Sequence, residues 1–280
     1  MNITKSIASI ASIVGVALMA TSQPVFSGEV MERVMETKVI RVATNSGYPP
    51  ASFLNANGVF EGYDIDVSKE LAKRMGAKVE FLNPAWEAIT SGKWGGRWEM
   101  SIGSMTPTPA RAKVLDFPAV YYYTPAAFYV HKDSAYETLS ELNGKRIGAS
   151  AGSTFEYYLQ HKLELDPAYS PAFEFAMTPG EVRTYEADSN VLDDLRLGDG
   201  KRLDAGITSV PTILEAIKAN YPIRILGDAV FYEPLAVVTS REDPEFSTKV
   251  GEIIEGMRAD GTLAKLSTKW FGTDLVTTSH

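Results

Sequence analysis

The chain has 280 residues, of which 35 are acidic, 27 are basic, three are histidine and none is cysteine. This composition excludes a disulfide framework and a thiolate metal site, and His131, His161 and His280 are expected at the surface. We therefore expect no metal and no cofactor. The acidic balance also argues against a nucleic-acid partner, whose phosphates the chain would repel.

Residues 1–27 have the composition of a secretory signal peptide. Lys5 supplies the positive charge, residues 7–20 form the apolar run, and the peptidase site is expected near Ser27. The run is shorter than the roughly 20 residues that span a bilayer. An uncleaved anchor or a lipoprotein is the alternative, and the absence of cysteine argues against the lipoprotein. Cleavage would leave an exported chain with 26 basic and 35 acidic residues, a net charge of -9.

The mature chain begins with a strand, a helix and a second strand. Apolar residues recur at helical spacing in residues 64–75, where Asp64 is the expected N-cap and Gly76 ends the pattern. Strands are predicted over residues 38–44 and 78–82, and a loop rich in Gly, Pro and Asn over residues 46–60.

The second half of the chain repeats this alternation. Strands are predicted over residues 145–150 and 202–208, and helices over residues 139–144, 154–163, 193–197 and 210–219. A strand at residues 235–240 and an amphipathic helical stretch at residues 245–266 do not belong to this second unit alone. The pattern predicts an α/β protein of two units with largely parallel sheets, and chain crossings near residues 121–123 and 231–234.

Residues 148–154, GASAGST, fit two different chemistries. They match the G-x-S-x-G turn that presents a nucleophilic serine, here Ser150, in hydrolases. That chemistry needs a histidine base far downstream, whereas His161 lies in the helix that the motif opens. The other interpretation is an anion cradle, in which Ser153, Thr154 and the backbone at a helix N-terminus donate to a carboxylate. Ordinary helix capping explains the segment alone equally well.

Residues that would serve the same ligand follow other strands, in the segments NSGYPPASF, NPAWEAI and GSMTPTPAR. In open α/β sheets ligands bind beyond the carboxyl ends of the strands, so these loops would meet at one edge. The planar guanidinium of Arg111 suits a carboxylate, and the rings of Tyr48 and Trp86 suit an apolar or cationic body. Taken singly, each residue has an ordinary alternative as a surface or packing residue.

Six segments, taken in order, form a more specific pattern: VIRVATNSGYPPASF, GVFEGYDIDVSKELAKRMG, GSMTPTPARAKVLDFPAVYY, ELNGKRIGASAGSTFEYYL, KRLDAGIT and MRADGTLAKLSTKWFG. With them the mature chain resembles the periplasmic solute-binding proteins of polar-amino-acid ABC importers, bacterial extracellular solute-binding protein family 3. The resemblance implies a two-lobed Venus flytrap fold, in which each lobe is a mainly parallel sheet flanked by helices and two crossover strands form the hinge. It implies a first lobe of residues 28–124 and 233–280 and a second lobe of residues 125–232.

The resemblance also implies a function without chemistry. Such a protein is a periplasmic monomer that captures an amino acid or a related small carboxylate-bearing solute between its lobes and delivers it to the transmembrane subunits of an ABC permease. When the family's binding residues are carried over one by one, the resemblance implies that Arg111, with Ser153 and Thr154, binds the ligand's carboxylate. It implies that Ser104 and Thr106 bind the ligand's amino or carboxylate group. Tyr48 and Trp86 would stack on the ligand, and Asn45 and Phe155 would face its side chain.

One position departs from the family pattern. These proteins usually place an aspartate, which takes the ligand's α-ammonium, five residues beyond the aspartate of a segment like RLDAGIT. Counting from Asp204 leads to Ser209, which is neutral, and a buried ammonium without a partner is costly. Three explanations stay open: the ligand lacks a primary α-amine, another acid such as Glu233 or Asp188 replaces the aspartate, or a gap displaces the local alignment.

Two other functions compete with the importer subunit. Cyclohexadienyl dehydratases resemble these receptors, and an enzyme of that type would need a general acid in the cleft, for which Glu233, Glu156 and Asp188 are the candidates. A sensor module that acts on a separate membrane partner is the third possibility.

Overall fold

The computed structural model describes residues 28–167 and 169–277. The predicted signal peptide and His280 lie outside the described residues. Within them, no helix combines the length and the apolar character that crossing a membrane requires.

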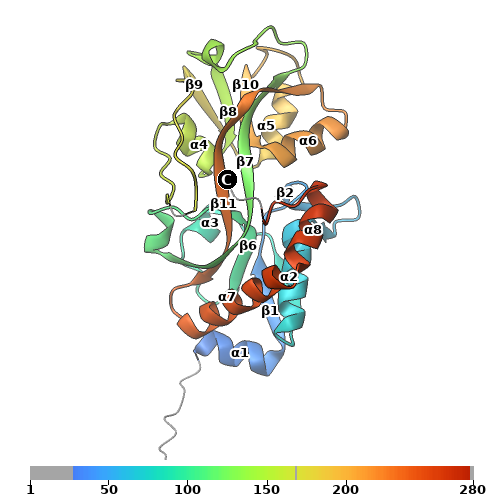
Figure 1. Cartoon of the computed structure of the whole chain (residues 1–280), viewed down its shortest axis with the longest axis vertical. Coiled ribbons are helices and arrows are strands. Elements are labelled where there is room, and N and C mark those ends of the chain that lie inside the picture. Colours follow the sequence, from blue (N-terminus) through green and yellow to red (C-terminus); the bar gives the residue numbers. More distant parts are fainter. Residues whose placement is uncertain (1–27, 168, 278–280) are drawn as a thin grey trace, which may run out of the picture.

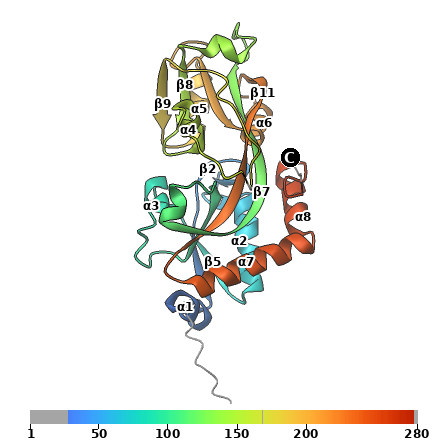
Figure 2. The same cartoon turned by 60° about the vertical axis from the view of Figure 1, so that its left-hand side comes forward.

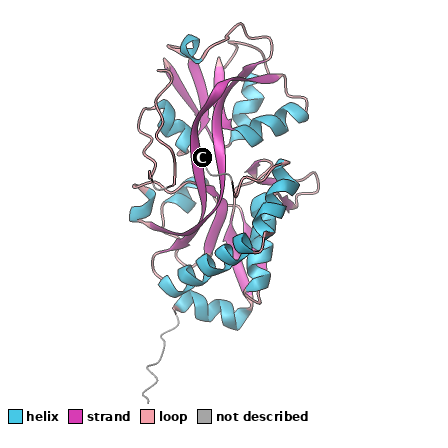
Figure 3. Ribbon diagram, viewed as in Figure 1, coloured by secondary structure: helices cyan, strands magenta, loops and turns pink. Residues whose placement is uncertain are grey.

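One continuous eight-stranded sheet, with the order β5-β1-β6-β11-β7-β10-β8-β9, runs through the molecule. Its two central strands, β7 (Leu115–His131) and β11 (Ile223–Ser240), pair antiparallel from one end to the other. The outer strands pair in parallel on both sides of them. The central pair therefore joins two lobes that lie one above the other (Figure 1; Figure 3, magenta).

The first lobe, the lower one in Figure 1, contains both ends of the described chain. Its remaining strands of the large sheet are β1 (Val39–Ala43), β5 (Lys78–Leu82) and β6 (Met100–Met105). A small antiparallel sheet is made of β2 (Gly47–Tyr48), β3 (Ser52–Leu54) and β4 (Phe60–Glu61). The helices are α1 (Glu29–Thr37), α2 (Tyr63–Arg74), α3 (Trp86–Thr90), the 3₁₀ turn Arg111–Lys113, α7 (Pro244–Ala259) and α8 (Thr262–Phe271).

The second lobe is built from the middle of the chain. Its strands are β8 (Arg146–Ser150), β9 (Glu181–Tyr185) and β10 (Ala205–Ser209). Its helices are the 3₁₀ turn Leu139–Leu142, α4 (Thr154–Leu159), α5 (Asp188–Leu195) and α6 (Val210–Lys218).

Each lobe has its own apolar core. In the first lobe, Ile40 and Leu71 pack with Ile254 of the late helix α7, which explains why the end of the chain returns there (Figure 2). In the second lobe, one face of the sheet packs around Phe128 and the other around Leu203. Two cores joined by two strands confirm the predicted two-lobed α/β architecture.

Several local predictions were wrong. Helix α4 ends at Leu159 instead of residue 163, because the chain turns at His161, whose φ is 55°. Helix α5 begins at Asp188, ahead of the predicted residues 193–197. The N-cap of α2 is Gly62, and Asp64 is the second residue of the helix, where Ser104 and Tyr121 donate to its carboxylate. The predicted loop over residues 46–60 contains the short strands β2 and β3 and reaches β4 at Phe60, and the two expected sheets merge into one.

Candidate ligand site

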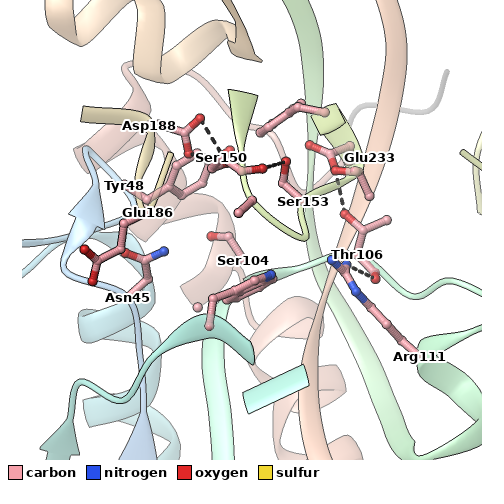
Figure 4. A pocket seen from close by; sticks show the side chains of 15 residues that line it. Asn45, Tyr48, Ser104, Thr106, Arg111, Ser150, Ser153, Glu186, Asp188 and Glu233 are labelled. Atoms are coloured by element: carbon pink, nitrogen blue, oxygen red, sulfur yellow. Dashed lines mark hydrogen bonds between the residues drawn. The ribbon is translucent and has the colours of Figure 1, made fainter. Parts of the chain in front are cut away.

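A small pocket lies between the two lobes. Loops that follow β1, β6 and β8 supply much of its lining, as expected for the carboxyl ends of parallel strands (Figure 4). Nine of the ten predicted site residues line it: Asn45, Tyr48, Trp86, Ser104, Thr106, Arg111, Ser153, Thr154 and Phe155. Ser209 does not. Among the described residues, no group of three or more His, Cys, Asp or Glu side chains could hold a metal ion.

Arg111 provides a buried positive charge at one end of the pocket. Its Nη1 donates to the Thr106 carbonyl and its Nη2 to the Gly152 carbonyl, both at 2.8 Å. The Trp86 ring lies 5.4 Å from the guanidinium carbon. Burial lowers the pKa of Arg111, because removal from water disfavours its charged form. Since both bonds go to neutral carbonyls, the guanidinium is suited to meet an anionic ligand.

The two lobes touch through this end of the pocket. Gly152 belongs to the second lobe, and its carbonyl accepts a bond from Arg111 and a 3.2 Å bond from Trp86 Nε1, both of the first lobe. On the far side, a Cβ on Gly47 would lie only 2.7 Å from that of Ala187. The described arrangement is therefore a closed one.

The GASAGST segment forms the end of β8 and the start of α4. Ser153 caps α4 by accepting from Glu156 N at 3.1 Å, so the capping interpretation is correct for its hydroxyl. His161 stacks on Phe175 with ring centres 4.5 Å apart and bonds the Met177 carbonyl. That histidine does not line the pocket that Ser150 lines, so the structure does not bring together the serine and histidine which the hydrolase interpretation requires.

A buried network holds Ser104 in place. Its φ is 56°, a left-handed value that is uncommon outside glycine. Its N–H donates to the Tyr121 hydroxyl at 3.0 Å, and its Oγ donates to Asp64 at 2.8 Å and lies 2.6 Å from the Tyr122 hydroxyl. Burial raises the pKa of Asp64 to about 6. The hydroxyl and the backbone N–H of Ser104 are therefore both bonded inside the protein.

Three carboxyl groups also line the pocket, those of Glu186, Asp188 and Glu233. Glu233, 2 % exposed, accepts from Thr106 Oγ1 at 2.7 Å and from Thr154 Oγ1. Burial raises its pKa, and these two bonds oppose the shift. Burial also raises the pKa of Asp188, to about 7. Figure 4 shows Asp188 and Glu186 on the side of the pocket away from Arg111, so the site is electrically polar.

Ser209 is buried and does not line the pocket. It ends β10 and caps α6, accepting from Thr212 N at 3.4 Å and donating to Thr212 Oγ1 at 3.0 Å. Its position at the end of the strand argues against a displaced alignment. Tyr48, 7 % exposed, lies next to Ser209, and burial raises the pKa of that phenol.

No motif in the sequence points to Glu186, and only an indirect signal points to Asp188 and Glu233. These two residues are candidates to replace an absent aspartate or to act as general acids. Acidic residues are common in the first turn of a helix, which is the position of Asp188, so their presence alone does not indicate a ligand.

Comparison with known proteins places this architecture among binding proteins. The family model described as bacterial extracellular solute-binding proteins, family 3, matches residues 40–273. The L-cystine-binding protein TcyJ of Escherichia coli K12 is 27% identical over 268 residues, covering 94% of each chain. The ABC transporter arginine-binding protein 1 of the same strain is 28% identical, covering 83% of this chain and 90% of the relative.

Two solved structures have similar folds. The ancestral amino acid-binding protein AncCDT-1, a precursor of cyclohexadienyl dehydratase, superimposes with a TM-score of 0.73 and 29% identity, covering 86% of this chain and 99% of its own. An ancestral arginine-binding protein bound to arginine gives a TM-score of 0.71 and 30% identity, covering 84% and 99%.

Proposed function

This chain belongs to family 3 of the bacterial extracellular solute-binding proteins, and we propose that it is the extracytoplasmic substrate-binding subunit of an ABC importer. Its ligand is an amino acid or a related small carboxylate-bearing solute. The relatives named above for cystine and arginine support this ligand class. The protein acts in the periplasm as a monomer and passes its ligand to the transmembrane subunits of a permease.

The observation that carries the proposal is the polar pocket between two touching lobes. Arg111 offers a guanidinium at one end, and Asp188 offers a carboxyl group at the other. A zwitterionic ligand would bridge them and draw contacts from both lobes. Ligand binding would then favour the closed state, the form that a permease would recognise.

The lobe boundaries of the proposal follow the central strands. Thr124 pairs with Glu233, and Pro125 pairs with Tyr232. A division into residues 28–124 with 233–280 and residues 125–232 therefore cuts both strands between the same two rungs of the ladder.

The proposal includes no catalysis. Glu156, a candidate general acid, accepts from Gly152 N at 2.6 Å and is not part of the pocket lining. Glu233 is bonded by two threonine hydroxyls on the side of Arg111. These two arrangements do not favour the dehydratase alternative, in which an acid has to reach the reacting bond. The third candidate, Asp188, does line the pocket, and we propose a binding role for it below.

A thermal-shift screen of the mature protein tests the proposal. The panel holds the common L-amino acids, L-cystine, betaines, N-substituted amino acids and small carboxylates. We expect one or a few amino acids to raise the unfolding midpoint, and Arg111→Ala to abolish that shift. Arg183→Ala, a change at a surface arginine outside the pocket, is the control. If no amino acid or carboxylate stabilises the protein, the proposal fails, and turnover of prephenate becomes the next assay.

A further inference from the structure

Asp188 is a buried carboxyl group with few partners of its own. It is 5 % exposed, and its partners are neutral: Ser150 Oγ contacts its two oxygens at the long distances of 3.4 and 3.3 Å, and the Thr208 hydroxyl and the backbone N–H of Asp188 also interact with the carboxyl group. Within the described residues it has no ion pair, and the titratable groups that act on it or feel its charge are Glu233, Tyr48 and Tyr129, none of them a cation. Burying a carboxylate without a cation is costly, so this position requires a compensating gain.

Other acids of the pocket are less available to a cationic ligand group. Glu233 already accepts from two threonine hydroxyls that reach it from opposite lobes, and it interacts with Arg111. Glu186 is exposed, so water already compensates its charge. Ser209 is neutral, and its hydroxyl is used to cap α6.

The geometry also sets the direction of a bound ligand. Arg111 and Asp188 line the same pocket from different lobes and lie toward opposite sides of it (Figure 4). A carboxylate at Arg111 leaves the opposite end of a small zwitterion to approach Asp188. Bonds at both ends would then hold the lobes together, because each end belongs to a different lobe.

We infer that Asp188 is the counterion of a cationic N–H group of the ligand and takes the role that Ser209 cannot fill. The inference rests on the proposed function and narrows its ligand class. The ligand is an amino acid that carries at least one protonated nitrogen with N–H donors at the Asp188 end, either the α-ammonium or a cationic side chain. A betaine or a plain carboxylate would leave Asp188 buried without a partner.

Titration calorimetry with Asp188→Asn tests the inference. The probe is the amino acid that raises the midpoint most in the screen. It is compared with its 2-hydroxy acid, which lacks the α-ammonium, and, for a cationic side chain, with a neutral analogue such as citrulline for arginine. Asp193→Asn makes the same chemical change on an exposed face of α5, outside the pocket, and serves as the matched control. Glu233→Gln is measured in parallel.

We expect Asp188→Asn to weaken binding of the amino acid by roughly 30-fold or more, the usual effect of removing one partner of a buried charged pair. The loss should vanish for the analogue that lacks the contacting nitrogen, which identifies that nitrogen. Asp193→Asn should bind like the wild type. Equal losses for every analogue, unchanged binding by Asp188→Asn, or a ligand-dependent loss only in Glu233→Gln would each overturn the inference. If no amino acid binds the wild type, it is the proposed function that fails.

Discussion

In the ligand-free protein, Asp188→Asn should increase the free energy of unfolding, and increase it more at pH 8 than at pH 5. Burial raises the pKa of Asp188 from 3.8 to about 7. A carboxyl group whose pKa is higher in the folded state binds its proton more tightly there. Its effect on stability is therefore neutral below pH 3.8 and becomes increasingly unfavourable as the pH rises toward 7.

The magnitude follows from the shift. Three pKa units, at about 1.4 kcal/mol each, correspond to about 4 kcal/mol at pH 8, and about 1.5 kcal/mol of this is present at pH 5. Asparagine has no charge to bury and retains an acceptor for Ser150. We therefore expect the variant to gain about 2 to 3 kcal/mol more over the wild type at pH 8 than at pH 5.

Urea unfolding followed by circular dichroism, without ligand and at both pH values, measures this difference. Asp193→Asn is again the control and should show no comparable pH dependence. A stability difference between Asp188→Asn and the wild type that is the same at pH 5 and pH 8, or larger at pH 5, would refute the reasoning. A confirmed difference means that this acid is retained at a cost to the empty protein.

Three further predictions concern other parts of the molecule. Arg111→Ala should weaken binding of a carboxylate ligand at least 100-fold by calorimetry, since two charge-assisted bonds at about 1.5–3 kcal/mol each are lost, and a change below tenfold would contradict its role. Glu99→Gln should lower the free energy of unfolding, measured in urea, by about 3 kcal/mol and leave ligand binding unchanged. Glu99 is 2 % exposed and pairs with Arg33 at 2.8 Å and with Arg41 at 2.5 Å, so the change breaks a buried ion pair. An unchanged urea midpoint would contradict this prediction. Gly47→Val should hold the lobes apart, because the added Cβ would lie 2.7 Å from that of Ala187. X-ray scattering with ligand should then give a larger radius of gyration for Gly47→Val than for the wild type or the exposed control Ala56→Val. Equal radii would show that the contact between residues 47 and 187 adjusts without holding the lobes apart.

The sequence predicts pocket-lining residues well where they lie at strand ends. Ser104 lies at the end of β6, Thr106 and Arg111 follow that strand, and the parallel-strand rule brings all three to the edge where the second lobe meets the first. Glu233 could not be assigned in this way. It lies within β11, and it reaches the cleft only because that strand crosses between lobes at its middle, which depends on the whole topology.

The local errors have similar causes. The sequence predicts chain crossings near residues 121–123 and 231–234, and β7 and β11 run through these residues as continuous strands of 17 and 18 residues. Interstrand pairing supplies that continuity, and single-strand patterns do not contain it. Asp64 looks like a helix cap because its residue type and spacing fit, yet the bonds from Tyr121 and Ser104 place its carboxylate beneath the pocket instead.

The pairing of β7 with β11 also limits how the lobes can move. The two strands are hydrogen-bonded in register from Leu115–Ser240 to His131–Ile223, with irregular steps at three places. Sliding one strand along the other would break these bonds together, whereas bending or twisting the pair keeps them. Lobe motion is thus reduced to rotation about a single narrow ribbon, and a single spectroscopic distance, from Gly58 in the first lobe to Gly198 in the second, should follow the whole opening.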